Sequence, residues 1–393
     1  MGGAIEPVSA DEARARLAAV EPVGVEEIAT GAAGGRVLAE DVLAPEDLPR
    51  WPRAMMDGFA IRAADAPGTL RIAGHLTMGR LWPKPLGAGE AVGIATGGVV
   101  PDGADAVVPI ELAAVAGDAV VVARTEAGKH VMRRGDDLAR GAVVAMRGRR
   151  LRAQELGALV GLGVARLRVH RRPRVAVLAS GGEVVAPAAT PAPGQVRDVN
   201  TTVQAAQLRR DGCEVVAGGV APDDTASLAA RLAELADGAD AVLLSGGSSV
   251  GPRDLAPAAL AAAGAAIVFH GIEVRPGRPT LFARLGGKPI VGLPGVPTSA
   301  HIIYEAFVRV LIARLAGETP RPAPSARATL ARSVASTVGR EDWVRVRLDA
   351  GAAHPLGGGA AFATLLSADG FIVVPAARAG LDAGEAVDVI LSE

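Results

Sequence analysis

Cysteine is nearly absent from this 393-residue sequence, in which Cys213 stands alone. A single thiol excludes an intrachain disulfide framework and a cysteine-cluster metal site, and it favours a reducing compartment. Aromatic residues are also scarce, at 3% of the chain, so the hydrophobic cores must consist mainly of Ala, Val and Leu. Neither sign of charge is in excess, because the formal net charge is −1. The composition therefore offers no electrostatic reason to expect a nucleic-acid partner.

Long apolar runs are absent as well. No stretch of about 18 uninterrupted apolar residues occurs, so we expect no membrane span. The first residues, MGGAIEPVSADEARARL, carry acids and no apolar core, which is unlike a signal peptide. These features predict a cytoplasmic protein. The 50 glycines and 27 prolines are spread along the chain and indicate many turns, and the length predicts two to four domains.

The most informative stretch is AVLLSGGSSVGPRD, at residues 241–254. Its aliphatic start predicts a buried strand, its Ser245-Gly246-Gly247-Ser248 segment a loop, and the apolar residues at 255–263 a helix. Such a loop can bring backbone N–H groups close to a phosphate at a helix N-terminus. It is neither a Walker loop nor Gly-x-Gly-x-x-Gly. The alternative is a turn that only connects strand to helix.

Two further segments repeat this arrangement. Aliphatic runs at 174–179 and 290–293 end in Ser180-Gly181-Gly182-Glu183 and in Pro294-Gly295. Helical stretches separate the predicted strands, at 202–210, 227–236 and 299–315. Strands that alternate with helices predict a doubly wound, mostly parallel sheet, in which ligands bind outside the carboxyl ends of the strands. Glycine is common in such loops in any case, so the alternative of plain connections stays open.

The regions on either side have shorter, glycine-punctuated strands. Residues 45–144 are interpreted as a small inserted β domain and residues 319–393 as a C-terminal β barrel. The insertion separates residues 1–44 from 145–172, which we assign together to a domain of helices and strands, and the α/β domain covers 173–318. The predicted fold is therefore a multidomain α/β protein.

Acidic side chains follow the predicted strand ends, at Glu183, Asp198, Asp223, Asp224 and Asp254. A phosphate cradle lined with acids requires a divalent cation between the like charges. Mg²⁺ is the natural choice, because it takes one or two carboxylates together with phosphate oxygens.

Two guanidinium groups stand on one turn, Arg-Pro-Gly-Arg-Pro at residues 275–279. Such a turn suits a tetrahedral oxyanion, and a solvated surface turn is the alternative. Two motifs of the inserted domain have a structural explanation as the alternative to a functional one. Asp57-Gly58 would be a tight turn, and Arg133-Arg134-Gly135-Asp136-Asp137 would be a solvated hairpin tip.

An ordered set of motifs spans nearly the whole chain: MMDGFA, ATGGVVPDGADAVVPIE, RRGDD, VAVLASGGE, DVN, LLSGGSSVGPRD, RPGRPTLFA, GLPGVPTS, GR…WVRVRL and LLSADGFIVVP. In this order they resemble the molybdopterin molybdenumtransferase family, which includes the E domain of gephyrin. The resemblance implies an elongated homodimer of four-domain subunits. The site would lie between the α/β domain of one subunit and the inserted β domain of the other. The implied reaction is release of AMP from adenylylated molybdopterin with Mg²⁺, while molybdate takes the dithiolene sulfurs.

The resemblance also implies roles for individual residues. The catalytic residues would be Asp57, Asp137, Glu183 and Asp254. The substrate would be bound by Thr96, Arg134, Ser180, Gly181, Asp198, Asn200, Ser245, Gly246, Gly247, Ser248, Pro294 and Gly295. The Mg²⁺ ligands would be Glu183, Asp223, Asp224 and Asp254. The molybdate pocket would contain Arg275, Arg278, Pro279, Arg345 and Thr364.

The sequence departs from the family pattern at four motifs. The family usually has Gly-Asp-Glu, Lys-Pro-Gly-Lys-Pro, Leu-Pro-Gly-Asn-Pro and a C-terminal Gly-Ser-Gly. Here the differing residues are Gly182, Arg275, Arg278, Val296 and Gly358. These changes suggest a divergent member, and they keep open a non-catalytic pterin-binding or scaffold paralogue. A generic nucleotide-binding α/β protein is a third reading. Other molybdenum-cofactor biosynthesis proteins are potential partners.

Overall fold

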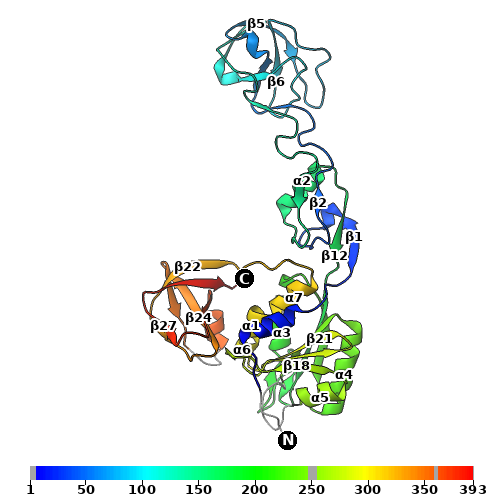
Figure 1. Cartoon of the computed structure of the whole chain (residues 1–393), viewed down its shortest axis with the longest axis vertical. Helices are drawn as coiled ribbons and strands as arrows, with labels where there is room; N and C mark the ends of the chain where they lie inside the picture. The colour runs from blue at the N-terminus through cyan, green and yellow to red at the C-terminus, as the bar shows by residue number, and fades with distance from the viewer. Residues whose placement is uncertain (1–5, 247–254, 358–361, 393) are drawn as a thin grey trace.

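The computed structural model describes residues 6–246, 255–357 and 362–392. Figure 1 shows the inserted β domain, coloured blue to cyan, at one end of the long axis. A small connecting domain lies in the middle, and the α/β domain lies at the other end with the C-terminal domain beside it. The chain passes through the connecting domain twice, because the β domain is inserted between its two halves.

The α/β domain contains β13 (Arg174–Ser180), β16 (Glu214–Ala221), β17 (Ala241–Ser245), β18 (Ala266–His270), β20 (Leu281–Leu285) and β21 (Lys288–Leu293). They form one sheet in the order β16-β13-β17-β21-β20-β18. Strands β16, β13, β17 and β21 are parallel, which confirms the predicted doubly wound arrangement. Strands β20 and β18 are antiparallel at one edge. The sequence pattern had not revealed this antiparallel edge.

Helices cover both faces of this sheet. They are α3 (Asn200–Arg210), α4 (Thr225–Gly238), α5 (Ala256–Ala262), α6 (Pro297–Ile303) and α7 (Arg309–Leu315), with a π-helical turn, η4 (Tyr304–Val308), between the last two. The long helix predicted at 299–315 is therefore present but interrupted by a π turn. Over the described ranges, no helix is both long and apolar enough to cross a membrane.

The two faces of the sheet bury different residues of the same strands. Val175 and Val177 of β13 belong to a core shared with α3, α6 and α7, whereas Ala176 and Leu178 belong to a core shared with α4 and α5. Successive strand residues point to opposite faces. A strand covered on both faces is therefore aliphatic throughout, as this sequence is.

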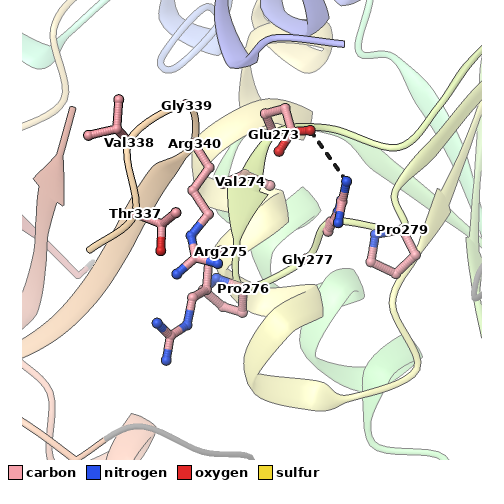
Figure 2. A pocket seen from close by; sticks show the side chains of 11 residues that line it. Glu273, Val274, Arg275, Pro276, Gly277, Pro279, Thr337, Val338, Gly339 and Arg340 are labelled. Carbon is pink, nitrogen blue, oxygen red and sulfur yellow. Dashed lines mark hydrogen bonds and ion pairs between the residues drawn. The ribbon is translucent and has the colours of Figure 1, made fainter. Parts of the chain in front are cut away.

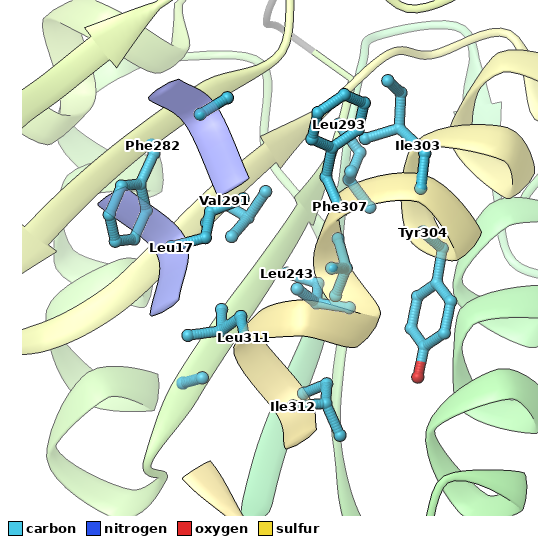
Figure 3. Close-up of a cluster of buried hydrophobic side chains, with 14 of the residues drawn as sticks. Leu17, Leu243, Phe282, Val291, Leu293, Ile303, Tyr304, Phe307, Leu311 and Ile312 are labelled. Atoms are coloured by element: carbon cyan, nitrogen blue, oxygen red, sulfur yellow. The ribbon is translucent and has the colours of Figure 1, made fainter. Parts of the chain in front are cut away.

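Helix α1 (Ala10–Ala18) packs on the first of these cores, although residues 1–44 were assigned to the connecting domain. Its Ser9 cap accepts a hydrogen bond from the Glu12 N–H at 3.2 Å. Figure 3 shows Leu17 of this helix close to Val291 within the core. A helix this short is stabilised mainly by packing, and the apolar surface near α7 provides that packing.

The connecting domain is held by two antiparallel pairs, β1 (Val25–Ala29) with β12 (Arg166–His170) and β2 (Val42–Leu43) with β11 (Val143–Ala145). Helix α2 (Ala153–Gly161) covers them. The inserted domain contains β3 (Arg53–Ala54), β4 (Gly58–Ile61), β5 (Gly68–His75), β6 (Glu90–Ile94), β7 (Ala106–Pro109), β8 (Ala113–Ala116), β9 (Ala119–Val122) and β10 (Val131–Met132). Its main sheet has the order β7-β4-β6-β5-β9-β8.

The C-terminal domain is a closed barrel, as predicted. Its strands are β22 (Ser325–Leu330), β23 (Val334–Ala335), β24 (Glu341–Asp349), β25 (Ala352–Pro355), β26 (Gly370–Val374), β27 (Gly380–Leu381) and β28 (Ala386–Leu391). The ring closes because β24 pairs with both β25 and β26. A strand from the α/β domain, β19 (Val274–Arg275), extends this sheet parallel to β24. The two domains therefore share backbone hydrogen bonds.

Candidate functional site

We call the region at the carboxyl ends of β13 and β17 the crevice, because a doubly wound sheet binds its ligand at such strand ends. Strand β16 lies on one side of β13 and β17 on the other, so the gap between these strand ends is the topological switch point. Ser180 ends β13 and Ser245 ends β17, both are buried, and Ala179 pairs with Ser245. The structure therefore brings the first two predicted phosphate loops together.

Gly246 allows these loops to meet. Its φ is 90°, and a Cβ at this position would lie 2.2 Å from the backbone oxygen of Ser180. Its N–H donates to the Leu293 carbonyl of β21 at 3.2 Å. Only glycine fits such a conformation and such a close approach. The third predicted loop, Pro294-Gly295, is thereby held against the other two.

Asn200 holds the loops from the side of α3, and Asp198 holds the first turn of that helix. The Asn200 amide donates to Ser245 Oγ at 2.7 Å and to the Gly295 carbonyl at 2.8 Å. The Asp198 carboxylate accepts the Thr201 N–H at 3.1 Å and also the Thr201 hydroxyl. Both residues are buried, and among the described residues the Asn200 Oδ1 has no hydrogen-bond partner. We expected both to contact the substrate, and the contacts with the protein show that Asn200 also joins two of the loops.

Two carboxylates lie at the glycines that follow β13. A Cβ on Gly181 would lie 3.0 Å from Glu183 Oε1, and a Cβ on Gly182 would lie 3.0 Å from Asp223 Oδ2. An aspartate at 182, as the family usually has, would start next to the Asp223 carboxylate. The glycine found here avoids a contact between two like charges. Short strands β14 (Val184–Val185) and β15 (Val196–Arg197) pair just beyond this point.

Asp224 has a different role from its neighbour. It is the N-cap of α4, and its carboxylate accepts the Ser227 N–H at 2.8 Å. This hydrogen bond is the main reason why the pKa of Asp224 is lowered. Of the two predicted aspartates, Asp223 is thus the one near the crevice.

Three predicted site residues, Gly247, Ser248 and Asp254, lie outside the described residues, as does Gly358, one of the departures from the family pattern. Within the residues that are described, no group of three or more His, Cys, Asp or Glu side chains could hold a metal ion.

In the inserted domain, Asp57 is held by Thr96. Its Oδ1 accepts the Thr96 N–H at 2.6 Å and the Thr96 hydroxyl at 2.9 Å. The backbone hydrogen bond is the main cause that lowers the pKa of Asp57, so the carboxylate stays ionised. Gly58 makes this turn possible, because a Cβ there would lie 2.0 Å from the Val108 carbonyl oxygen. The structure therefore contains both the tight turn at Asp57-Gly58 and an exposed carboxylate on Asp57.

The Arg133–Asp137 turn lies in the same domain. Arg134 pairs with Asp47 at 2.6 Å, and the Asp137 N–H donates to the Leu48 carbonyl at 3.1 Å while its side chain is exposed. A 290 Å³ cavity lies next to Thr96, lined by Trp51, Arg53, Leu76, Met78, Gly79, Arg80, Leu81, Gly97, Gly98 and Val99. This domain and the α/β domain occupy opposite ends of the molecule (Figure 1). One chain therefore does not bring Asp57, Thr96 and Asp137 to the crevice.

The arginine turn lines a second cavity, of about 520 Å³, at the junction with the C-terminal barrel (Figure 2). Its lining is Glu273, Val274, Arg275, Pro276, Gly277, Arg278, Pro279, Thr337, Val338, Gly339 and Arg340. The predicted Arg275, Arg278 and Pro279 are brought together here. Arg340 was not predicted, although it lies within the GR…WVRVRL motif. Only its place in space, next to Arg275, identifies it.

Arg345 and Thr364, the remaining members of the predicted molybdate set, do not line this cavity. Arg345 is buried, its Nη2 lies 3.5 Å from the Gly357 carbonyl, and burial lowers its pKa. Thr364 belongs to α8 (Phe362–Leu366), which lies against α6. Of the expected five residues, three therefore line the cavity, while Arg345 lies in the barrel strand β24 and Thr364 lies in α8.

Comparison with known proteins identifies all three parts of the chain. The family model "MoeA N-terminal region (domain I and II)" matches residues 8–163. The model "Probable molybdopterin binding domain" matches 176–314, and "MoeA C-terminal region (domain IV)" matches 327–392.

Individual relatives agree with these matches. Molybdopterin molybdenumtransferase 2 of Mycobacterium tuberculosis (strain ATCC 25618 / H37Rv) is 37% identical over 331 residues, which cover 81% of this chain and 82% of the relative. Molybdopterin molybdenumtransferase of Bacillus subtilis (strain 168) is 30% identical over 405 residues, with 98% and 94% covered. Two crystal structures of the molybdopterin biosynthesis MoeA protein from Pyrococcus horikoshii match at TM-scores of 0.81 and 0.86, with 31% and 26% identity. They cover 98% of this chain, and 99% and 100% of their own chains are matched. The chain belongs to the molybdopterin molybdenumtransferase family.

Proposed function

We propose that this chain, a transferase of molybdenum cofactor biosynthesis, inserts molybdenum from molybdate into adenylylated molybdopterin and releases AMP. The observation that carries the proposal is the pairing of a phosphate-type crevice with an arginine-lined cavity. Helix α6 joins the two: it begins two residues after Gly295, and a Cβ on Gly277 would lie 2.3 Å from Ile303 Cγ1 at its end. A helix of seven residues is about 10 Å long, which is a suitable separation for two parts of one substrate site.

The crevice would bind the phosphate part of the substrate. Backbone N–H groups near Gly181 and Gly246 are at the strand ends where anions bind in this type of sheet. Asn200 would hold the loops in place, and Asp198 would hold the first turn of α3. Gly247 and Ser248 would complete the cradle.

The arginine cavity would hold the molybdate. Arg275 and Arg278 are more than half exposed, so their N–H groups can reach an incoming oxyanion. A guanidinium can donate two hydrogen bonds in parallel to a tetrahedral oxyanion. The replacement of lysine by arginine in this turn retains the positive charge needed here.

The side chains near Gly181 and Gly182 decide whether this region suits Mg²⁺. Glu183 and Asp223 are oxygen ligands of the type that Mg²⁺ prefers, and their carboxylates lie next to Gly181 and Gly182. Two carboxylates together with phosphate oxygens and water suffice for this ion. The residues therefore fit, with Asp254 as a further ligand. Bound Mg²⁺ would neutralise phosphate charge next to these acids.

A homodimer would complete the site. Asp57, Thr96 and Asp137 are too far along the molecule to meet Glu183 of their own chain (Figure 1), so we propose that they meet the Glu183 of a second copy. Asp57, kept ionised by Thr96, would then supply a carboxylate opposite the crevice. The chain would act in the cytoplasm, together with other proteins of cofactor biosynthesis.

A non-catalytic pterin-binding protein is the second candidate, because Gly182 lacks the carboxylate that the family usually has there. The two can be separated by incubating the purified chain with adenylylated molybdopterin, Mg²⁺ and molybdate. We expect AMP release in the wild type and in Asp237→Ala, an exposed control in α4, and none in Asp254→Ala. Absence of AMP release by the wild type at every molybdate concentration, with substrate binding retained, would establish the second candidate instead.

A further inference from the structure

A single buried carboxylate contacts two arginines of the cavity. Asp342, whose side chain is 5% exposed, accepts hydrogen bonds from Arg340 at 2.9 Å (Nε to Oδ1) and 3.4 Å (Nη2 to Oδ2). Its Oδ2 also lies 3.7 Å from Arg275 Nη1. The two arginines come from different domains, and Asp342 itself lies on the barrel strand β24.

The shared strand pairing explains this contact. In the parallel pair of β19 with β24, Arg275 is in register with Asp342, so their side chains lie next to each other. The barrel loop 337–340 leads directly into β24 and forms the opposite wall of the cavity. Figure 2 shows the guanidinium groups of Arg275 and Arg340 close together, with Thr337 beside them.

The hydrogen-bonding capacity of Arg340 is only partly used by Asp342. A guanidinium has five N–H donors, and the two printed contacts involve Nε and Nη2. Arg340 remains 30% exposed and lines the cavity, so donors remain available on the side of the cavity. Arg278 lines the same cavity and pairs with Glu273 at 3.4 Å.

The charges around the cavity favour an anion. Among the described residues, Arg275, Arg278 and Arg340 pair with two carboxylates, Glu273 and Asp342, and the Asp342 side chain is buried. A buried carboxylate fixes the orientation of its guanidinium partners, and it reduces the entropy lost when they bind an oxyanion.

We infer that Arg340 is a third anion-binding residue of the molybdate pocket, supplied by the C-terminal barrel, and that Asp342 positions Arg340 and Arg275 for a tetrahedral dianion. This inference rests on the proposed function and extends it. The pocket would be complete only where the barrel docks on the α/β domain. Arg275 alone would hold the anion loosely.

The test is isothermal titration calorimetry of the full chain with sodium molybdate, in the absence of pterin substrate. Arg340→Ala and Arg275→Ala should each weaken binding about ten-fold or more. Arg340→Lys should weaken it less, because it keeps the charge and loses the fork geometry. Arg327→Ala is the matched control, since Arg327 pairs with Asp388 at 2.9 Å on the same barrel and away from the cavity. Thermal unfolding of each variant checks that the fold is retained.

The Asp342→Asn variant distinguishes two roles for Asp342: positioning of the arginines, and a negative charge that only repels the anion. If Asp342 were only a nearby negative charge, its removal would tighten molybdate binding. If it positions the arginines, its removal weakens binding, as we expect. Unchanged binding in a folded Arg340→Ala, with binding lost in Arg275→Ala, overturns the inference and leaves the proposed function intact. Absence of molybdate binding by the wild type overturns the inference, and the AMP-release assay then decides on the proposed function separately.

Discussion

The side-chain amide of Asn200 donates to Ser245 Oγ at 2.7 Å and connects helix α3 to the end of β17. The same nitrogen reaches the Gly295 carbonyl at 2.8 Å, so one residue fixes the loops of two strands that are distant in sequence. All these groups are at the proposed phosphate-binding crevice.

Asn200→Ala should therefore affect both stability and activity. The change leaves a buried hydroxyl and a carbonyl without their donor, which costs about 1–3 kcal/mol of unfolding free energy. We expect a lower thermal unfolding midpoint and a raised KM for the nucleotide substrate. Gln195→Ala, which removes an amide side chain at an exposed position, is the control. Equal behaviour of the two variants would show that Asn200 does not hold the loops.

Gly246 and Gly295 form a matched pair of tests. Gly246→Ala places a Cβ 2.2 Å from the Ser180 oxygen at a φ of 90°, whereas Gly295→Ala meets only Gly246 Cα at 3.8 Å. The left-handed conformation alone costs an alanine about 1–2 kcal/mol, and the contact adds to that. We expect Gly246→Ala to be less stable than the wild type and to lose most AMP release. We expect Gly295→Ala to unfold like the wild type. Similar unfolding curves for both variants would contradict the close packing of the two loops.

The hydrogen bonds of Asp57 predict how its charge and its contribution to stability depend on pH. Its pKa lies below the ordinary value of 3.8, chiefly because of the Thr96 N–H, so the fold favours the ionised form. This contribution to stability is present above the ordinary pKa and is lost as the pH falls through the lower folded value. Titration of the Asp57 carboxyl by NMR should show the lowered pKa. Thr96→Val should raise it, because the hydroxyl is removed and the backbone donor stays. A titration at the ordinary value in the wild type would contradict the Thr96 contacts.

Local patterns predicted much of this molecule. The aliphatic runs of β13, β17 and β21 have glycine at their ends, and each could be recognised within about ten residues of sequence. The barrel and the inserted domain followed from short strands separated by turns. Asp224 caps helix α4 by accepting the Ser227 N–H, and such a cap can be recognised from the local sequence. The sequence interpretation nevertheless placed Asp224 among the metal ligands.

Long-range relations could not be read from the sequence. The pairing of β19 with β24 joins residues 274–275 to 341–342, and no local pattern indicates it. Arg340 was therefore not predicted, although it lines the cavity beside Arg275 and Arg278. Helix α1 was misplaced for the same reason, because its apolar stripe shows that it packs but not on what.

The central claim is that the active site forms between two copies of the chain, and mixing two inactive variants tests it most directly. Asp57→Ala and Glu183→Ala each disable one half of the proposed site. Random pairing of equal amounts gives mixed dimers in about half of the population, each with one intact site. AMP release should then recover to about a quarter of the wild-type rate. If Asp57 and Glu183 of the same chain formed the site, every chain in the mixture would carry a defect, and the mixture would stay inactive.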